Sequence, residues 1–179
     1  IKRGSTKERI VPDRGTGRAV VGQNYDGNGP AWFVASGKVV ENGDREVEAL
    51  GEIDTRREAV LDRRFAELLT PVPAYNADST SYIDLTEYRP NLQVYHYSTP
   101  EDRVAVFSEI YYDRGWDAYI DGQPASHFRA DYVLRGMVLP AGEHVVEFRF
   151  RARNFATIST ITLVCSILIV LGVVAAAIT

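Results

Sequence analysis

Cysteine is almost absent from this sequence, and charge is absent from its C-terminal end. The one cysteine, Cys165, lies in an uncharged run over residues 155–179, so residues 1–154 cannot form an internal disulfide. This argues against a disulfide-rich secreted module and fits a reducing compartment or an ordinary bacterial envelope protein. The formal net charge of −4 offers no basic face to a phosphate backbone, so no nucleic-acid partner is predicted.

Motifs of metal, cofactor and catalytic sites are also lacking. The three histidines, His96, His127 and His144, have no helical metal spacing and no cysteine nearby. The glycine pairs over 15–17 and 27–29 lack the helix and lysine that a phosphate-binding loop requires, and there is no GxSxG pattern. We therefore predict no metal, no cofactor and no catalytic residue, and an independent hydrolase is the least supported of the functions considered.

The longest apolar run, FATISTITLVCSILIVLGVVAAAIT, covers residues 155–179. A helix rising about 1.5 Å per residue crosses a hydrocarbon core of about 30 Å over such a length. The run is too long for an ordinary core helix and lies at the wrong end for a signal peptide. We predict a transmembrane helix over 155–179. Because the chain begins at Ile1 without a signal sequence, we also expect that more protein precedes it.

The rest of the chain has the composition of one folded domain. Residues 1–154 carry all 20 Lys and Arg and all 24 Asp and Glu, and their length permits a real core. Glycine and charge dominate residues 1–30, which predicts an irregular leading segment with at most one short strand. We predict a single domain over 31–153, with a strand candidate at 31–40 and one or two short helices at about 43–70.

From Ser79 onward, the sequence alternates with period two, which predicts strands separated by short turns. Asp121-Gly122 suits a tight hairpin turn, because both residues tolerate positive φ. A second hairpin is predicted around Pro140 to Gly142. The predicted fold class is mainly β, an antiparallel β-sandwich of jelly-roll type. Trp116, Phe148 and Phe150 are expected in or against its core.

Three arginines before the uncharged run permit two interpretations. Arg149, Arg151 and Arg153 can form a cytoplasmic positive flank. They also follow a period of two on a strand that alternates with phenylalanine. The strand interpretation explains their spacing, whereas the flank explains only their number. We therefore expect residues 1–153 outside the cytoplasmic membrane.

Aromatic residues are concentrated in the second half of the domain, near Asp and Arg. Aromatic rings with such neighbours suit sugars, although strands favour aromatics in a core as well. The residues around Arg129, Asp131, Tyr132 and Arg135 can form either an internal salt-bridge network or a polar pocket. The candidate glycan-binding residues are Tyr112, Trp116, Tyr119, Asp121, Arg129 and Arg135.

Residues 108–153 contain a series of motifs: Tyr-Tyr, Gly-Trp, Asp-Gly, an Arg-x-x-Tyr-x-x-Arg run and Pro-x-Gly-x-His. With GPAWFV (29–34) and ALGEIDTRREAVLDRRF (49–65), they resemble the C-terminal region of the YfhO family of bacterial membrane proteins. Asp131 stands where that pattern has Asn. The matching residues are Tyr111, Tyr112, Gly115, Trp116, Asp121, Gly122, Arg129, Tyr132, Arg135, Pro140, Gly142 and His144.

The resemblance implies a parent with many membrane helices, similar to GT-C glycosyltransferases that use polyprenyl-phosphate sugars outside the cytoplasmic membrane. Its catalytic carboxylate would lie in the absent membrane part. The leading hypothesis is an accessory extracytoplasmic domain that positions or recognises a cell-envelope glycan or lipid-linked sugar, with the C-terminus on the cytoplasmic side. Its other expected partners are the lipid bilayer and the upstream membrane helices. The alternatives are a purely structural domain or a carbohydrate-binding module of another membrane protein.

Overall fold

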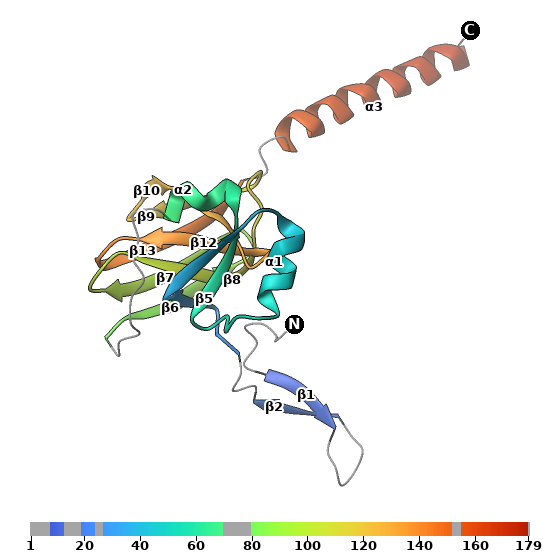
Figure 1. Ribbon diagram of the computed structural model, residues 1–179. Coiled ribbons are helices and arrows are strands. Elements are labelled where there is room, and N and C mark those ends of the chain that lie inside the picture. The colour runs from blue at the N-terminus through green and yellow to red at the C-terminus, as the bar shows by residue number, and fades with distance from the viewer. Residues whose placement is uncertain (1–7, 13–18, 24–26, 70–79, 152–154, 179) are drawn as a thin grey trace.

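The computed structural model describes residues 8–12, 19–23, 27–69, 80–151 and 155–178 (Figure 1). The protein is mainly β, and its larger sheets are antiparallel, as the period-two sequence predicts. In chain order the elements are β1 (Glu8–Pro12), β2 (Ala19–Gln23), β3 (Ala31–Val34), β4 (Ser36–Val40), α1 (Gly43–Leu50), β5 (Glu58–Asp62), η1 (Arg63–Phe65), α2 (Ala66–Leu69), β6 (Tyr82–Arg89), β7 (Leu92–Thr99), β8 (Arg103–Ile110), β9 (Trp116–Ile120), β10 (Gln123–Ala125), β11 (Phe128–Ala130), β12 (Leu134–Leu139), β13 (Gly142–Phe150) and α3 (Phe155–Ile178).

Two antiparallel sheets share one hydrophobic core. The first has the strand order β10-β9-β13-β7-β6, and the second has the order β11-β12-β8-β3. Tyr95 and Phe148 from the first sheet meet Phe107 from the second at ring-centroid distances of 4.8 and 4.9 Å. All three side chains are fully buried. The core therefore lies between the inner faces of the two sheets.

The alternation predicted for β13 is confirmed. Val146 and Phe148 are fully buried, while Val145 and Arg149 on the other face are partly exposed. Phe148 lies inside the core and Trp116 packs against it, as predicted, whereas Phe150 is 38% exposed at the end of β13 and contacts Trp116 at a ring-centroid distance of 5.4 Å. The prediction for Phe150 is therefore wrong. The strand interpretation therefore holds for Arg149 but not for Arg151, which follows the end of β13. Arg153 lies outside the described residues.

The last two strands of the domain insert between earlier ones. β13 pairs with β7 and β9, and β12 pairs with β8 and β11. The segment Pro140–Gly142 therefore links the two sheets and does not close a hairpin, so that prediction is wrong. β12 pairs within the second sheet, and its Met137 and Leu139 side chains belong to the shared core.

The hairpin at Asp121-Gly122 is confirmed. Both residues have positive φ, 50° and 77°, as a tight two-residue turn between twisted strands requires. Ile120 and Gln123 pair across the turn. The Asp121 Oδ1 atom accepts a hydrogen bond from the Val145 amide at 2.9 Å, which ties the turn to β13.

The segment 31–70 differs from the expectation in two ways. The strand candidate at 31–40 divides into β3 and β4, which belong to different sheets. Residues 58–62, inside the range 43–70 where one or two short helices are predicted, form β5, parallel to β4, and the second helical segment, η1 with α2, begins at Arg63. Ala59, Val60 and Leu61 are all fully buried, and a short run buried on both faces is typical of a strand. The expected first helix is α1, capped by Asn42, which accepts a hydrogen bond from the Arg45 amide at 3.1 Å.

The two ends of the chain extend from this domain. β1 and β2 pair as an antiparallel ribbon within the leading segment, where at most one strand is predicted. α3 is helical over Phe155–Ile178. Over the part of the chain that the structure describes, no helix is long and apolar enough to cross a membrane. The predicted membrane span therefore stays a prediction.

Truncating Phe148 tests the shared core. This ring contacts both Phe107 and Tyr95, so Phe148→Ala leaves a cavity between the sheets. We expect a loss of about 3–5 kcal/mol in the free energy of unfolding, measured by urea denaturation. The control is Tyr88→Ala, at a side chain that is 62% exposed, which should change stability by less than about 0.5 kcal/mol. Equal losses in the two variants would contradict this account of the core.

Candidate functional site

Arg135, a candidate binding residue, lies inside the domain. Its side chain is 1% exposed, and its guanidinium carbon lies 4.7 Å from the Trp116 ring centroid and 4.3 Å from that of Phe148. It donates hydrogen bonds to the Gln93 Oε1 atom at 3.0 Å and to the Ile110 carbonyl at 3.1 Å. Burial lowers the pKa of Arg135 to about 10. This arginine therefore joins the two sheets from within.

The other candidate residues do not form one patch. Trp116 begins β9, whereas Asp121 follows its far end and bonds to His144 at 2.6 Å. Five residues at about 3.3 Å each separate these two ends by roughly 16 Å. Tyr119 faces outward, with the Arg149 guanidinium 4.5 Å from its ring centroid. The structure brings Tyr112 and Trp116 to one end of the domain and leaves Tyr119 and Asp121 apart from them.

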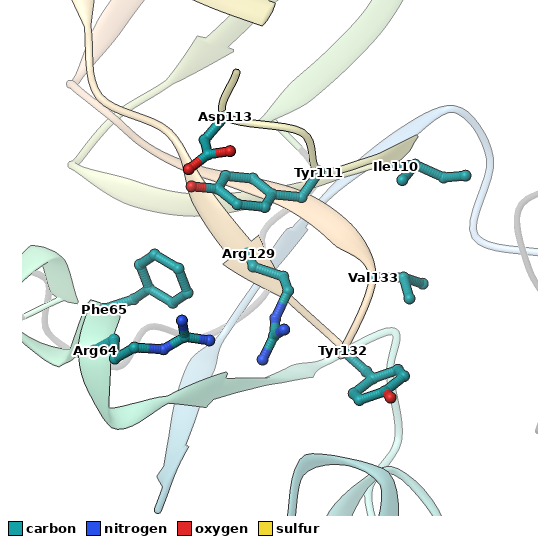
Figure 2. A pocket seen from close by; sticks show the side chains of 8 residues that line it. All are labelled: Arg64, Phe65, Ile110, Tyr111, Asp113, Arg129, Tyr132 and Val133. Carbon is teal, nitrogen blue, oxygen red and sulfur yellow. The ribbon is translucent and has the colours of Figure 1, made fainter. Parts of the chain in front are cut away.

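Arg129, by contrast, lines a pocket of about 500 Å³ (Figure 2). The pocket is assembled from four segments that are distant in the sequence: η1, the end of β8 with the following loop, β11, and the turn after β11. Figure 2 shows the Arg64 and Arg129 side chains approaching each other on one side of it. The lining residues are Arg64, Phe65, Ile110, Tyr111, Asp113, Arg129, Tyr132 and Val133.

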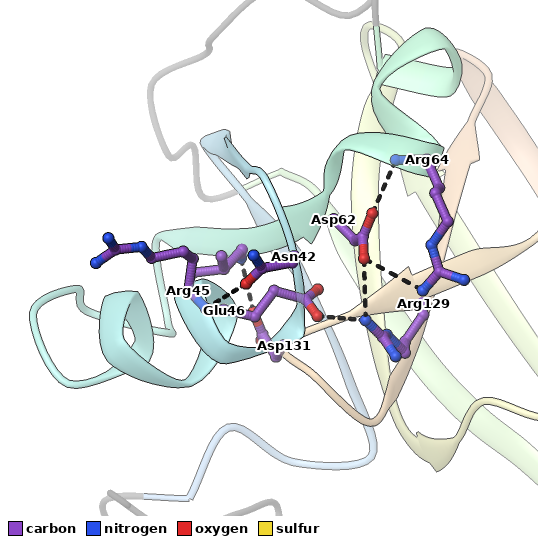
Figure 3. Close-up of polar contacts among 8 residues, drawn as sticks. Asn42, Arg45, Glu46, Asp62, Arg64, Arg129 and Asp131 are labelled. Atoms are coloured by element: carbon purple, nitrogen blue, oxygen red, sulfur yellow. Dashed lines mark hydrogen bonds and ion pairs between the residues drawn. The ribbon is translucent and has the colours of Figure 1, made fainter.

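An ion-pair network lies beneath the pocket (Figure 3). The Arg129 Nη2 atom lies 2.5 Å from the Glu46 Oε2 atom and 3.5 Å from the Asp62 Oδ2 atom. Arg64 contacts the same Asp62 oxygen at 3.2 Å, and its amide donates to the Asp62 Oδ1 atom at 2.9 Å. The two alternatives predicted for Arg129 therefore coexist, because it belongs to an internal network and also lines a pocket. Arg135 belongs to neither.

The carboxylates of this network differ in their electrostatics. Glu46 is fully buried on α1, and burial raises its pKa against the opposing effect of the Arg129 charge. The pKa of Asp62 is lowered, first by the hydrogen bond from the Arg64 amide and then by the Arg64 side chain. Asp62 therefore stays ionised and holds both arginines in place. Sequence patterns did not identify Glu46, Asp62 or Arg64, because only the fold brings these segments together.

Strained backbone borders the pocket. Asp131 and Tyr132 have φ of 49° and 70°, a region that non-glycine residues rarely adopt and that tends to occur at ligand sites. Asp131 is held by two hydrogen bonds to Val60: its amide donates to the Val60 carbonyl at 2.8 Å, and its Oδ1 atom accepts from the Val60 amide at 2.8 Å. This pairing supports the conformation that places Tyr132 at the pocket.

The pocket combines ring faces with polar groups. Phe65, Tyr111 and Tyr132 supply rings, Arg64 supplies N–H donors, and Asp113 supplies a carboxylate acceptor. Such a mixture suits a polar ligand with a partly apolar face. Among the described residues, no group of three or more His, Cys, Asp or Glu side chains is placed to hold a metal ion.

Comparisons with protein-family models, with curated proteins and with solved structures gave no match. The function therefore has to be argued from the geometry of the pocket and from the sequence resemblance.

Replacing Asp131 with asparagine tests the buried carboxyl at the pocket. Burial, opposed by the Val60 hydrogen bond and reinforced by the Glu46 charge, raises the pKa of Asp131 to about 6 from an ordinary value of 3.8. The folded state thus binds a proton more tightly than the unfolded state, and stability is lost as pH rises through this interval. Asparagine keeps the acceptor oxygen and tolerates positive φ. We expect Asp131→Asn to raise the free energy of unfolding by about 2 kcal/mol at pH 7 and by little near pH 4.

When the variant is compared with the wild type at the same pH, the contributions of other titrating groups to the free energy of unfolding cancel. Burial lowers the pKa of His127 to about 4, so this residue makes stability rise with pH, the opposite of Asp131. Both proteins contain His127, and denaturation at each pH therefore isolates the Asp131 contribution in the difference. A gain that is the same at both pH values would contradict the burial argument.

Proposed function

We propose that this chain is the extracytoplasmic domain of a membrane glycosyltransferase-like protein, and that its pocket recognises a glycan. The observation that carries the proposal is the composition of the pocket, in which three aromatic rings face an arginine and a carboxylate. Sugar C–H faces stack on such rings, while charged side chains exchange hydrogen bonds with hydroxyl groups. The resemblance to the YfhO family supplies the class of parent protein.

Arg64 and Asp113 are the polar groups best suited to contact a ligand. Arg129 is held by Glu46 and Asp62, so its role is mainly to shape the pocket floor. Arg64 contacts Asp62 through one nitrogen, and its side chain is 67% exposed. A guanidinium has five N–H donors, which leaves Arg64 donors for a ligand. Asp113 lies across the pocket on the loop after β8 and offers acceptors (Figure 2).

The same proposal includes a jelly-roll topology for the sandwich and a membrane span at the C-terminal end. Insertion of β12 and β13 between earlier strands supports a jelly-roll-like sandwich. The membrane span over 155–179 rests on the sequence: the run has no charged residue, and transmembrane helices need about 20 mostly apolar residues.

Sugar titrations test the pocket. The full chain in detergent or nanodiscs is titrated with methyl hexosides, N-acetylhexosaminides and uronic acids at millimolar concentrations, with binding followed by ligand-observed NMR. We expect at least one sugar class to bind. Arg64→Gln and Asp113→Asn should each weaken binding by about tenfold, because hydrogen bonds to charged groups contribute about 1.5–3 kcal/mol.

The control for these variants is Glu143→Gln, an exposed charge at the start of β13. It should leave binding unchanged, and all three variants should unfold within a few degrees of the wild type. A rival function, a purely structural domain without a ligand, is favoured by the internal roles of Arg129 and Arg135. Absence of binding by every sugar tested would leave that structural function in place of glycan recognition.

The proposed topology is tested separately. Protease added to intact spheroplasts that carry the full protein should degrade residues 1–153, because a large folded domain can be translocated despite its charge. A cytoplasmic marker protein should survive in the same sample and be degraded only after permeabilisation. Full protection of the domain in intact spheroplasts would refute this orientation.

A further inference from the structure

We infer that the end of the domain from which the chain continues into α3 rests on the surface of a lipid bilayer. This end, called the exit face below, carries six exposed apolar or aromatic side chains. The inference rests on the proposed membrane span over 155–179 and adds to it a contact between the folded domain and lipid. The exit face consists of Tyr88, Ile110, Tyr112, Tyr132, Val133 and Phe150.

Strand register places the first-sheet members of the exit face together. β13 ends at Phe150, which pairs with Trp116 at the start of β9. The adjacent residue of β13, Arg149, pairs with Leu92 at the start of β7. The rings of Tyr112 and Phe150 both lie against the small Gly115 in the loop before β9. The end of the first sheet thus carries Tyr112 beside the last residue of β13.

The second sheet ends at the same place. Ile110 closes β8 and pairs with Leu134 at the start of β12, and the Tyr111 amide donates to the Val133 carbonyl at 2.8 Å. The short segment 111–115 connects this end of β8 to the start of β9. Tyr88 lies near the end of β6, next to the start of β7. Residues from both sheets therefore share one face.

Exposed apolar side chains concentrate on this face. Of the ten exposed large hydrophobic residues within 27–69 and 80–151, six belong to it. Ile110 is 71% exposed and Tyr112 is 50% exposed. Single exposed hydrophobic residues are ordinary, but a contiguous group marks an interaction site. At the opposite end of the domain, the turns contain polar residues such as Asp102, Asp121 and Glu143.

The short covalent link between β13 and α3 favours lipid as the partner of the exit face. At no more than about 3.6 Å per residue, the five steps from Phe150 to Phe155 span at most about 18 Å. The polar layer on one side of a bilayer is about 5–8 Å thick. If α3 enters the hydrocarbon core, the exit face has to lie at or close to the headgroups. Tyrosine is favoured at that depth, and the exposed Arg114 and Arg151 complement anionic lipid.

The exit face and the pocket overlap. Ile110, Tyr132 and Val133 belong to both. A ligand in the pocket would therefore lie beside the headgroups, where the sugar of a lipid-linked donor or acceptor is found. The glycan proposed above is accordingly of a kind presented at the membrane surface.

Depth-dependent quenching in liposomes tests this contact. In a Cys165→Ser background, an NBD label is placed by Ile110→Cys or Val133→Cys on the exit face, by Gln123→Cys at the far end of the domain, and by Ile169→Cys in α3. The full chain is reconstituted in phosphatidylethanolamine–phosphatidylglycerol liposomes with nitroxide-labelled lipids. We expect the labels at 110 and 133 to shift to shorter wavelength and to lose most of their fluorescence to headgroup nitroxides. The label at 123 should keep its fluorescence.

The label at 169, in α3, tests the proposed membrane span independently of the contact between the exit face and lipid. If acyl-chain nitroxides quench it while the labels at 110 and 133 behave like the label at 123, the membrane span stands and the exit-face contact is refuted. If the label at 169 is not quenched, the membrane span fails as well. If the labels at 110 and 133 are shielded from aqueous iodide but not quenched by lipid, a protein surface covers this face and the lipid contact is refuted. Circular dichroism of each variant confirms that it is folded.

Discussion

The contact of Phe148 with Phe107 and Tyr95 is the interaction on which the structure depends. It joins two sheets whose strands are interleaved along the chain, so the inner face of each sheet is completed by the other. Arg135 lies against the same Phe148 ring and carries its charge into the core. Its guanidinium donates hydrogen bonds to Gln93 and to the Ile110 carbonyl, and burial lowers its pKa.

The packing of the two sheets determines which loops lie next to one another at their common end. The loop after β8, the turn after β11 and η1 converge there and enclose the pocket. Asp62 pairs with both Arg64 and Arg129 at the pocket floor, and Glu46 on α1 pairs with Arg129 from the other side. The pocket floor thus includes the Arg129–Glu46 pair, whose carboxylate is fully buried. Such pairs are costly to break and hold their members in one geometry.

The same end carries the exit face and the start of the proposed membrane span. A binding pocket beside a bilayer suits a ligand that is itself held at the membrane, such as a lipid-linked sugar. The position of the pocket and the direction of the chain support the proposed role of the domain in recognising an envelope glycan.

The sequence by itself determined the main strands after Ser79, the Asp121-Gly122 turn and the helix over 155–178. These follow from local causes: period-two burial, tolerance of positive φ, and unbroken apolarity. Sequence proximity was misleading for the candidate site, because Trp116 and Asp121 lie at opposite ends of one strand. Only the tertiary structure decided that Arg135 is buried and that Arg64 and Arg129 share a pocket. Those facts depend on which strands pair across long sequence separations, and local patterns carry no information about that pairing.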